Sequence, residues 1–145
     1  MSTLSSLEAG ARFATGRVAR LATVDADGHP HLVPIVFVVH DGIIFSAVDA
    51  KPKRTMDLRR LANVEANPAV SVLVDHYDDE DWTVLWWARA DGTARVLPPE
   101  HPQARTAVSL LATKYRQHRE QPPPGPVLAI SVARWSGWRH APTRS

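Results

Sequence analysis

The chain has 145 residues, 44% of them hydrophobic, which favours one buried core and a single domain over residues 1–145. Lys and Arg (17) exceed Asp and Glu (15) by two, an excess too small for a protein that wraps nucleic acid. There is no cysteine, which excludes disulfides and thiolate chemistry, and no window approaches the ~20 apolar residues of a membrane span. We therefore expect a cytoplasmic protein that binds neither nucleic acid nor membrane.

The N-terminal segment predicts a short amphipathic helix. Ser5-Ser6-Leu7-Glu8 has the spacing of a capping box, and Gly16 ends the helical pattern. The apolar positions that recur on one helical stripe, and that we expect to face the core, are Leu4, Leu7, Ala11 and Ala14.

Three antiparallel strands are expected next. Residues 18–24 are rich in β-formers, residues 25–28 are a turn signal, and residues 31–39 form a second apolar run, so the pair predicts a β-hairpin. A turn at residues 40–42 leads into a third strand over residues 43–48. Pro34 cannot donate to a strand ladder, so it should lie on an edge, at a bulge, or facing something other than a neighbouring strand.

The most basic segment of the chain, residues 49–60, follows these strands. Pro52 stiffens it, and Thr55 is expected to cap a short helix suggested by Leu58, Leu61 and Ala62. A helix N-terminus flanked by cations is suited to a phosphate, although such a segment is also compatible with a solvated turn that has no ligand. Its basic residues are Lys51, Lys53, Arg54, Arg59 and Arg60.

Beyond a turn at Asn67-Pro68, residues 70–74 alternate as a strand with Val70, Val72 and Val74 on one face. The acidic loop over residues 75–81 lacks the spacing of a calcium loop and is expected to be solvated. Residues 82–97 are apolar at both parities, which predicts a strand covered on both faces. Asp91-Gly92 within it is either a tight hairpin or a bulge in one long strand.

The C-terminal third predicts a helix and a last strand. The helix begins near Pro98–Pro102, the proline-rich residues 121–126 form a stiff connector, and residues 127–134 alternate as a strand that continues to His140. The apolar face of the helix is expected to contain Ala104, Ala107, Val108, Leu111, Ala112 and Tyr115.

No familiar catalytic motif is present: there is no nucleophile elbow, Walker loop, dinucleotide glycine motif or His-Glu-x-x-His. His29 and His31 lack a third ligand, so we expect no metal site. Six strands, two helices, the basic loop and the tryptophans together indicate a barrel that binds a flat, anionic, aromatic ligand. Packing in the core and in a dimer is the other interpretation of the tryptophans, which are Trp82, Trp86, Trp87, Trp135 and Trp138.

The order of these segments resembles the split β-barrel flavin and deazaflavin oxidoreductases, the pyridoxamine-phosphate-oxidase-like proteins, over nearly the whole chain. The resemblance rests on residues 18–24, 27–37, the Lys/Arg loop, residues 67–72 and residues 89–96. It is closest to the branch that uses the 8-hydroxy-5-deazaflavin coenzyme F420. The chain lacks the Arg-x-x-x-Leu-Lys pattern associated with phosphate binding in true pyridoxamine phosphate oxidases, which argues against a role in vitamin metabolism.

The resemblance implies a mainly β (α+β) fold: a six-stranded antiparallel split barrel of the FMN-binding type with short flanking helices. It also implies a homodimer with cofactor sites at the interface, and a strand that is apolar on both faces suits such an interface. On this reading His31, Val33 and Pro34 lie along the ring of the cofactor, and Val74, Asp75 and His76 come from the partner chain. Trp138 lies near the pocket mouth, and the anionic tail is held by Lys51, Lys53, Arg54 and Thr55.

The expected function is an oxidoreductase in which reduced F420 transfers a hydride to a small unsaturated or quinone-like acceptor. Because the cofactor carries this chemistry, no catalytic side chain is predicted. A proton donor, where one is needed, is His31, His76 or water. The alternatives are an FMN-dependent oxidoreductase of the same fold and a non-catalytic carrier or sensor of F420 or flavin.

Overall fold

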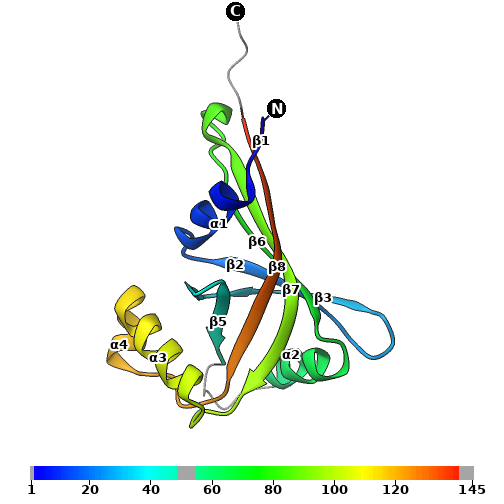
Figure 1. The fold of residues 1–145 in the computed structure, drawn as a ribbon, viewed down its shortest axis with the longest axis vertical. Coiled ribbons are helices and arrows are strands. Elements are labelled where there is room, and N and C mark those ends of the chain that lie inside the picture. Colours follow the sequence, from blue (N-terminus) through cyan, green and yellow to red (C-terminus); the bar gives the residue numbers. More distant parts are fainter. Residues whose placement is uncertain (1, 49–54, 141–145) are drawn as a thin grey trace, which may run out of the picture.

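The computed structural model describes residues 2–48 and 55–140, which fold into one antiparallel sheet with short helices around it (Figure 1). The strands are β1 (Ser2–Thr3), β2 (Ala19–Val24), β3 (Pro30–Ile35), β4 (Val38–His40), β5 (Ile43–Ala47), β6 (Ala69–His76), β7 (Trp86–Leu97) and β8 (Val127–Arg139). The helices are α1 (Ser6–Ala14), α2 (Thr55–Ala66), the 3₁₀ turn η1 (Trp82–Val84), α3 (Pro102–Lys114) and α4 (Arg116–Glu120). The predicted residues Lys51, Lys53 and Arg54 lie outside the described part.

The strand order makes the sheet curl into a barrel. The order is β3-β2-β6-β7-β8-β5-β4, with β1 paired to β8. Its two ends, β3 and β4, are joined by Val36 and Phe37 alone, a link that spans no more than about 10 Å. The two edges of the sheet must therefore meet, which confirms the predicted antiparallel split barrel. The described part contains eight strands, not six, because β1 is added and the predicted strand over residues 31–39 is divided.

That strand is divided because two side chains at the C-terminal end of α3, Lys114 and Tyr115, take the backbone hydrogen bonds of Phe37. The Phe37 amide donates to Tyr115 Oη (3.2 Å), and its carbonyl accepts from Lys114 Nζ (3.0 Å) and Tyr115 Oη (3.0 Å). Since these groups are satisfied by side chains, Phe37 has no need of a neighbouring strand. Pro34 lies in β3, at one end of the sheet order, as expected for a residue that cannot donate to a ladder.

The pairing of β7 with β8 decides between a tight hairpin and a bulge at Asp91-Gly92. The register with β8 shifts between these residues, so they form a bulge in one bent strand. A Cβ on Gly92 would lie 2.1 Å from the Ser131 carbonyl oxygen, so only glycine permits this approach. The predicted start of the strand at Trp82 is wrong. Asp81 Oδ1 accepts the Thr83 amide (3.0 Å) and caps η1 instead, which leaves Trp82 60% exposed.

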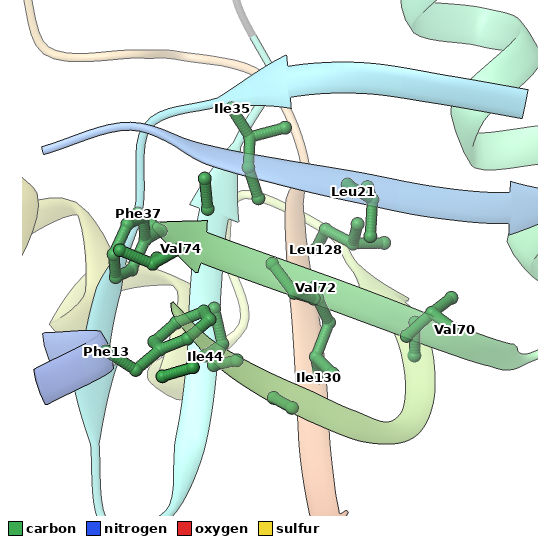
Figure 2. Packing of buried hydrophobic residues seen from close by; sticks show 14 of the residues in the cluster. Phe13, Leu21, Ile35, Phe37, Ile44, Val70, Val72, Val74, Leu128 and Ile130 are labelled. Carbon is green, nitrogen blue, oxygen red and sulfur yellow. The ribbon is translucent and has the colours of Figure 1, made fainter. Parts of the chain in front are cut away.

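The core fills the space between the curled sheet and α1. Figure 2 shows Phe13 reaching into a cluster of strand residues that includes Val72, Ile44 and Ile130. The Phe13 ring packs on Phe37 and on Trp135, with centroids 5.0 and 5.1 Å apart. The predicted alternation of β6 is confirmed, because Val70, Val72 and Val74 are all buried.

The cap that the Ser5–Glu8 spacing predicts at the start of α1 is confirmed, but most of the predicted apolar stripe is wrong: of its four residues only Leu4, which precedes the helix, is buried. Ser5 Oγ accepts the Glu8 amide (3.1 Å), yet the residues buried on the helix are Ala9 and Phe13, while Leu7 is 85% exposed. The chain before the helix explains the difference. The Leu4 amide donates to the Gly137 carbonyl (3.0 Å), which ties the approach to α1 to β8 and turns the Ala9–Phe13 side inward.

The helix α3 confirms its predicted face, with Ala104, Ala107 and Leu111 buried against the sheet. The short helix α4 was not predicted. It follows a break at Tyr115, whose hydroxyl is fixed by Phe37 and by the Arg17 carbonyl (2.9 Å). None of the helices in the described ranges combines the length and apolar character needed to cross a membrane.

Candidate functional site

The predicted cofactor residues of β3 divide between the two faces of the strand. Val33 is in the core and pairs with Leu21, and His31 shares its parity and pairs with Thr23. Pro34 has the other parity and is exposed. Pro34 therefore belongs to what we call the outer face, the face of β3, β2, β6, β7 and β8 that points away from the core.

His31 lies in a polar part of the barrel interior. Its partner Thr23 is 1% exposed and accepts a hydrogen bond from Asn63 Nδ2 (3.0 Å), through which α2 is joined to β2. His31 Nδ1 is buried and has no hydrogen-bonding partner among the described residues. A buried polar atom without any partner costs about 1–3 kcal/mol, which makes His31 Nδ1 a candidate contact for a bound molecule.

The three predicted residues at the end of β6 contribute to a pocket of about 360 Å³. Its walls come from the α1–β2 connection, the end of β6 and the start of β7. They are formed by Thr15, Gly16, Arg17, Val18, Arg20, Val74, Asp75, His76 and Trp86.

Aromatic and basic side chains hold this pocket in shape. The His76 ring stacks on Trp86, with centroids 6.3 Å apart and planes 23° apart, and Arg12 lies over the same indole at 5.6 Å. Arg17 donates to the Lys114 carbonyl (2.9 Å) and lies 4.8 Å from the Tyr115 ring. The pocket therefore offers donors and a stacking surface, with Asp75 as its carboxylate.

Within one protomer, His31 on β3 lies far from the pocket formed at the end of β6 by Val74, Asp75 and His76. Ala22 pairs with Leu32 on one side and with Ser71 on the other, which defines one row across three strands. His31 lies one residue to one side of this row and Val74 three residues to the other. At about 3.3 Å per residue the groups are at least about 13 Å apart along the sheet.

Trp138 lies on the outer face and does not line that pocket. It pairs with Trp87, which pairs with Asp75, so these three side chains share a row and a face. Trp138 Nε1 and Ser136 Oγ are both buried without a partner among the described residues. Nearby on the same face, Asp91 accepts from Ser71 (2.6 Å) and Arg89 (3.2 Å), and Arg89 lies 5.4 Å from the Trp87 ring.

A family model described as pyridoxamine 5'-phosphate oxidase matches residues 8–139. The chain belongs to this family. No curated protein in the comparison matched the sequence.

Solved structures similar to this member of the pyridoxamine 5'-phosphate oxidase family span nearly the whole chain. An FAD-binding protein from Mesorhizobium loti is 26% identical, with a TM-score of 0.69 over 94% of this chain and 95% of the other. A conserved hypothetical protein from Mycobacterium tuberculosis is 24% identical, with a TM-score of 0.71 over 98% and 91%. The heme storage protein HutZ from Vibrio cholerae is 15% identical, with a TM-score of 0.71 over 94% and 95%. The last two show the fold alone.

Within this family fold, α2 begins at Thr55, directly after the basic residues that lie outside the described part. Arg59 on α2 is exposed. The exposed turn before β3 gathers Asp25, Asp27 and His29, whose ligand atoms lie within 4.8 Å of one another. Backbone hydrogen bonding explains that cluster, since Asp25 Oδ1 accepts the Asp27 and His29 amides (2.9 Å each), and the His29 amide lowers the pKa of Asp25.

The sequence did not predict several residues of the outer face and of the pocket at the end of β6. Leu32 is 68% exposed on the outer face, and its shared parity with Pro34 was the available signal. Arg17, Arg20 and Trp86 join the pocket at the end of β6 only because β2 and β7 flank that strand, a pairing that no local pattern contains.

Proposed function

We propose that this protein is a flavin-type oxidoreductase that binds its ring cofactor between two copies of the chain. The family match over residues 8–139 supports an oxidase-like fold, and the 26% identical FAD-binding protein supports a flavin. The chemistry supplied by such a cofactor when bound is hydride transfer, here to a small unsaturated or quinone-like acceptor.

The observation that carries this proposal concerns two residues expected to face the cofactor. His31 Nδ1 and Trp138 Nε1 are both buried, and neither has a hydrogen-bonding partner among the described residues. A flavin ring carries nitrogen and oxygen atoms at its edge that can accept or donate such bonds. The two atoms lie on opposite faces of the sheet, so a ring against the outer face would satisfy Trp138 Nε1, and that face fits the group because the atom otherwise carries a desolvation cost. His31 Nδ1 faces the barrel interior, and its contact with the cofactor stays a prediction from the sequence.

The spacing of the predicted site residues supports a site shared with a second copy of the chain. His31 and the Val74–His76 group are too far apart in one protomer to contact one ring, so we assign the latter to the partner subunit's contribution. The outer face is suited to the contact, because it carries Trp87 and Trp138 and the unpartnered Ser136 Oγ. The twofold symmetry of a dimer would create two equivalent sites.

The protein's own residues would bind the cofactor and orient its ring. Leu32 and Pro34 offer exposed apolar surface on the outer edge strand, against which a flat ring can lie. Lys51, Lys53 and Arg54 of the basic segment would hold the anionic tail. A proton would come from His31, His76 or water.

The identity of the cofactor, F420 or a flavin, is a separate question. Five basic residues in residues 51–60 suit the long, multiply charged tail of F420, which we favoured from the sequence. The named FAD-binding relative supports FAD or FMN instead. A non-catalytic carrier or sensor of the same cofactor is distinguished by binding without turnover.

The test is a parallel titration of the purified protein with FAD, FMN and F420, followed by ligand fluorescence. At least one should bind, and His31→Ala and Trp138→Phe should each weaken that binding about tenfold. The matched controls are His29→Ala and Trp82→Phe, which should bind like wild type. The His29 side chain is 76% exposed, and Trp82 is 60% exposed. Failure of all three cofactors to bind would sink the proposal, and equal losses in the controls would remove the site assignment.

A dimer is tested by light scattering of the same protein. We expect twice the mass of one chain. Substituting Trp87→Asp on the outer face should yield monomers that lose cofactor affinity. Cofactor binding by a stable monomer would contradict the shared site.

A further inference from the structure

A second concave surface lies on the opposite side of the sheet from the outer face. It is a groove of about 550 Å³ between α1 and the β4–β5 turn, with β8 at its base. The residues that line it are Ser6, Leu7, Gly10, Ala11, Val39, Gly42 and Trp135. None of them belongs to the cofactor site proposed above. We propose that this groove binds an uncharged, flat aromatic molecule.

The base of the groove is a fixed indole. Trp135 pairs with Ala90, a fully buried residue, and the edge of its ring is held by Phe13 at 5.1 Å and 63°. A Cβ on Gly10 would lie 3.4–3.5 Å from ring atoms of Trp135, so the glycine leaves part of the indole uncovered by any side chain. A flat ring gains contact by stacking on such a surface.

Two side-chain donors among the lining residues, the Ser6 hydroxyl and Trp135 Nε1, are available to orient the molecule. No described residue accepts a hydrogen bond from Trp135 Nε1, although this atom is not among the fully enclosed polar atoms. The groove has no ionisable side chain among its lining residues. Its chemistry therefore selects an uncharged ring with an oxygen or nitrogen acceptor at its edge.

The rim places a large apolar side chain in water. Leu7 is 85% exposed in the first turn of α1, where the hydrogen bond from the Glu8 amide to Ser5 Oγ (3.1 Å) fixes the start of the helix. The facing rim is the tight turn at Gly42, whose φ is +73°. A leucine held at the edge of an apolar groove gains favourable burial only when the groove is occupied.

The size of the groove favours a small molecule over a second copy of the chain. Its volume falls within the ~300–1,000 Å³ of ligand pockets, and its seven lining residues are far fewer than the ~20–30 on one side of a stable protein interface. Trp135 and Trp138 lie on opposite faces of β8, since they pair with the inward Ala90 and with Trp87 of the outer face. A dimer formed through the outer face would leave the groove open.

The test uses the full chain labelled with 5-fluorotryptophan and followed by ¹⁹F NMR, without cofactor. The probes are menadione, an uncharged quinone, and 1-naphthoate, its anionic counterpart of similar size; Trp135→Phe assigns the resonance. We expect menadione to shift the Trp135 resonance saturably and 1-naphthoate to leave it unchanged. A menadione shift confined to other tryptophans, or no saturable shift, would overturn the site, and equal binding of 1-naphthoate would overturn the uncharged class.

Two variants test the groove itself. Gly10→Leu fills the space above the indole and should weaken menadione binding at least about tenfold. Ala14→Leu adds the same side chain to an exposed position of the same helix outside the groove and should bind like wild type. Leu7→Ser, which changes only an exposed rim residue, should weaken binding severalfold without altering the fold, so the proposal stays testable if Gly10→Leu does not fold. Equal affinities across these variants would contradict it. Because no cofactor is present, these results stand apart from those of the cofactor titration.

Discussion

Asn63 Nδ2 donates a hydrogen bond of 3.0 Å to Thr23 Oγ1 inside the barrel, where the two residues are only 4% and 1% exposed. Through this bond α2, which begins at the end of the basic segment, is joined to the strand that pairs with His31. The position of the helix and the position of a predicted cofactor residue therefore depend on one buried polar pair.

Thr23→Val should lower the free energy of unfolding by about 1–3 kcal/mol, because it preserves shape but leaves the Asn63 amide without its acceptor. Chemical denaturation at fixed protein concentration measures this. Thr113→Val, on the exposed face of α3, should change stability by no more than about 0.5 kcal/mol. If the two variants are equally stable, the pair contributes nothing to the fold.

Gly92→Ala should destabilise the protein by about 1–3 kcal/mol, because the new Cβ would lie 2.1 Å from the Ser131 carbonyl oxygen and the β7–β8 bulge would have to open. Gly10→Ala is the control, since its Cβ makes only ordinary contact at 3.4 Å within a helix, and it should stabilise by about 0.4–1 kcal/mol. Thermal unfolding of both proteins gives the comparison. A stable Gly92→Ala protein would show that the bulge does not depend on glycine.

Ser5→Ala should cost about 1 kcal/mol, because the Glu8 amide loses its acceptor at the start of α1. Ser6→Ala removes a neighbouring hydroxyl that makes no capping bond and should be within about 0.5 kcal/mol of wild type. Urea denaturation distinguishes the two. The reverse order would mean that Ser5 does not cap the helix.

Lys114 should make stability rise with pH in the alkaline range. Burial lowers its pKa from 10.5 to about 8, with a smaller effect of the same sign from Arg17. Between these values the folded protein has released the proton and the unfolded chain still holds it, so the unfolded state binds more protons and the free energy of unfolding increases. Below about pH 8 both states are charged and this contribution is constant.

The measurement compares wild type with Lys114→Met by denaturation from about pH 8 to about pH 10.5. The stability of wild type relative to the variant should grow across that interval. Groups common to both proteins, such as Tyr115, whose pKa is raised by burial, largely cancel in the difference. A difference that stays flat or shrinks would mean that the folded and unfolded chains hold this proton equally.

Local patterns predicted most elements because their causes are local. The cap at Ser5, the alternation of Val70, Val72 and Val74, and the stripe of Ala104, Ala107 and Leu111 all depend on spacing alone, and all appear in the structure. The family resemblance is confirmed for the fold by the match over residues 8–139. The residues assigned to the cofactor remain predictions.

The errors arose where a distant contact decided the outcome. The strand over residues 31–39 breaks because Lys114 and Tyr115 take the hydrogen bonds of Phe37. The face of α1 is set by Leu4 bonding to Gly137, more than a hundred residues away. Neither contact can be predicted from the spacing of apolar residues, because that spacing depends only on neighbours along the chain.

The sequence by itself determined the order of most strands along the chain and the basic segment after the third predicted strand, because hydrophobic spacing and turn chemistry act over a few residues. The split-barrel class came from the resemblance of these ordered segments to a known family. Only the tertiary structure decided that Gly92 forms a bulge, that His31 points inward while Pro34 points outward, and that Arg17, Arg20 and Trp86 share a pocket with His76. These features depend on register and on which strands become neighbours, and register is set by the packing of the whole core.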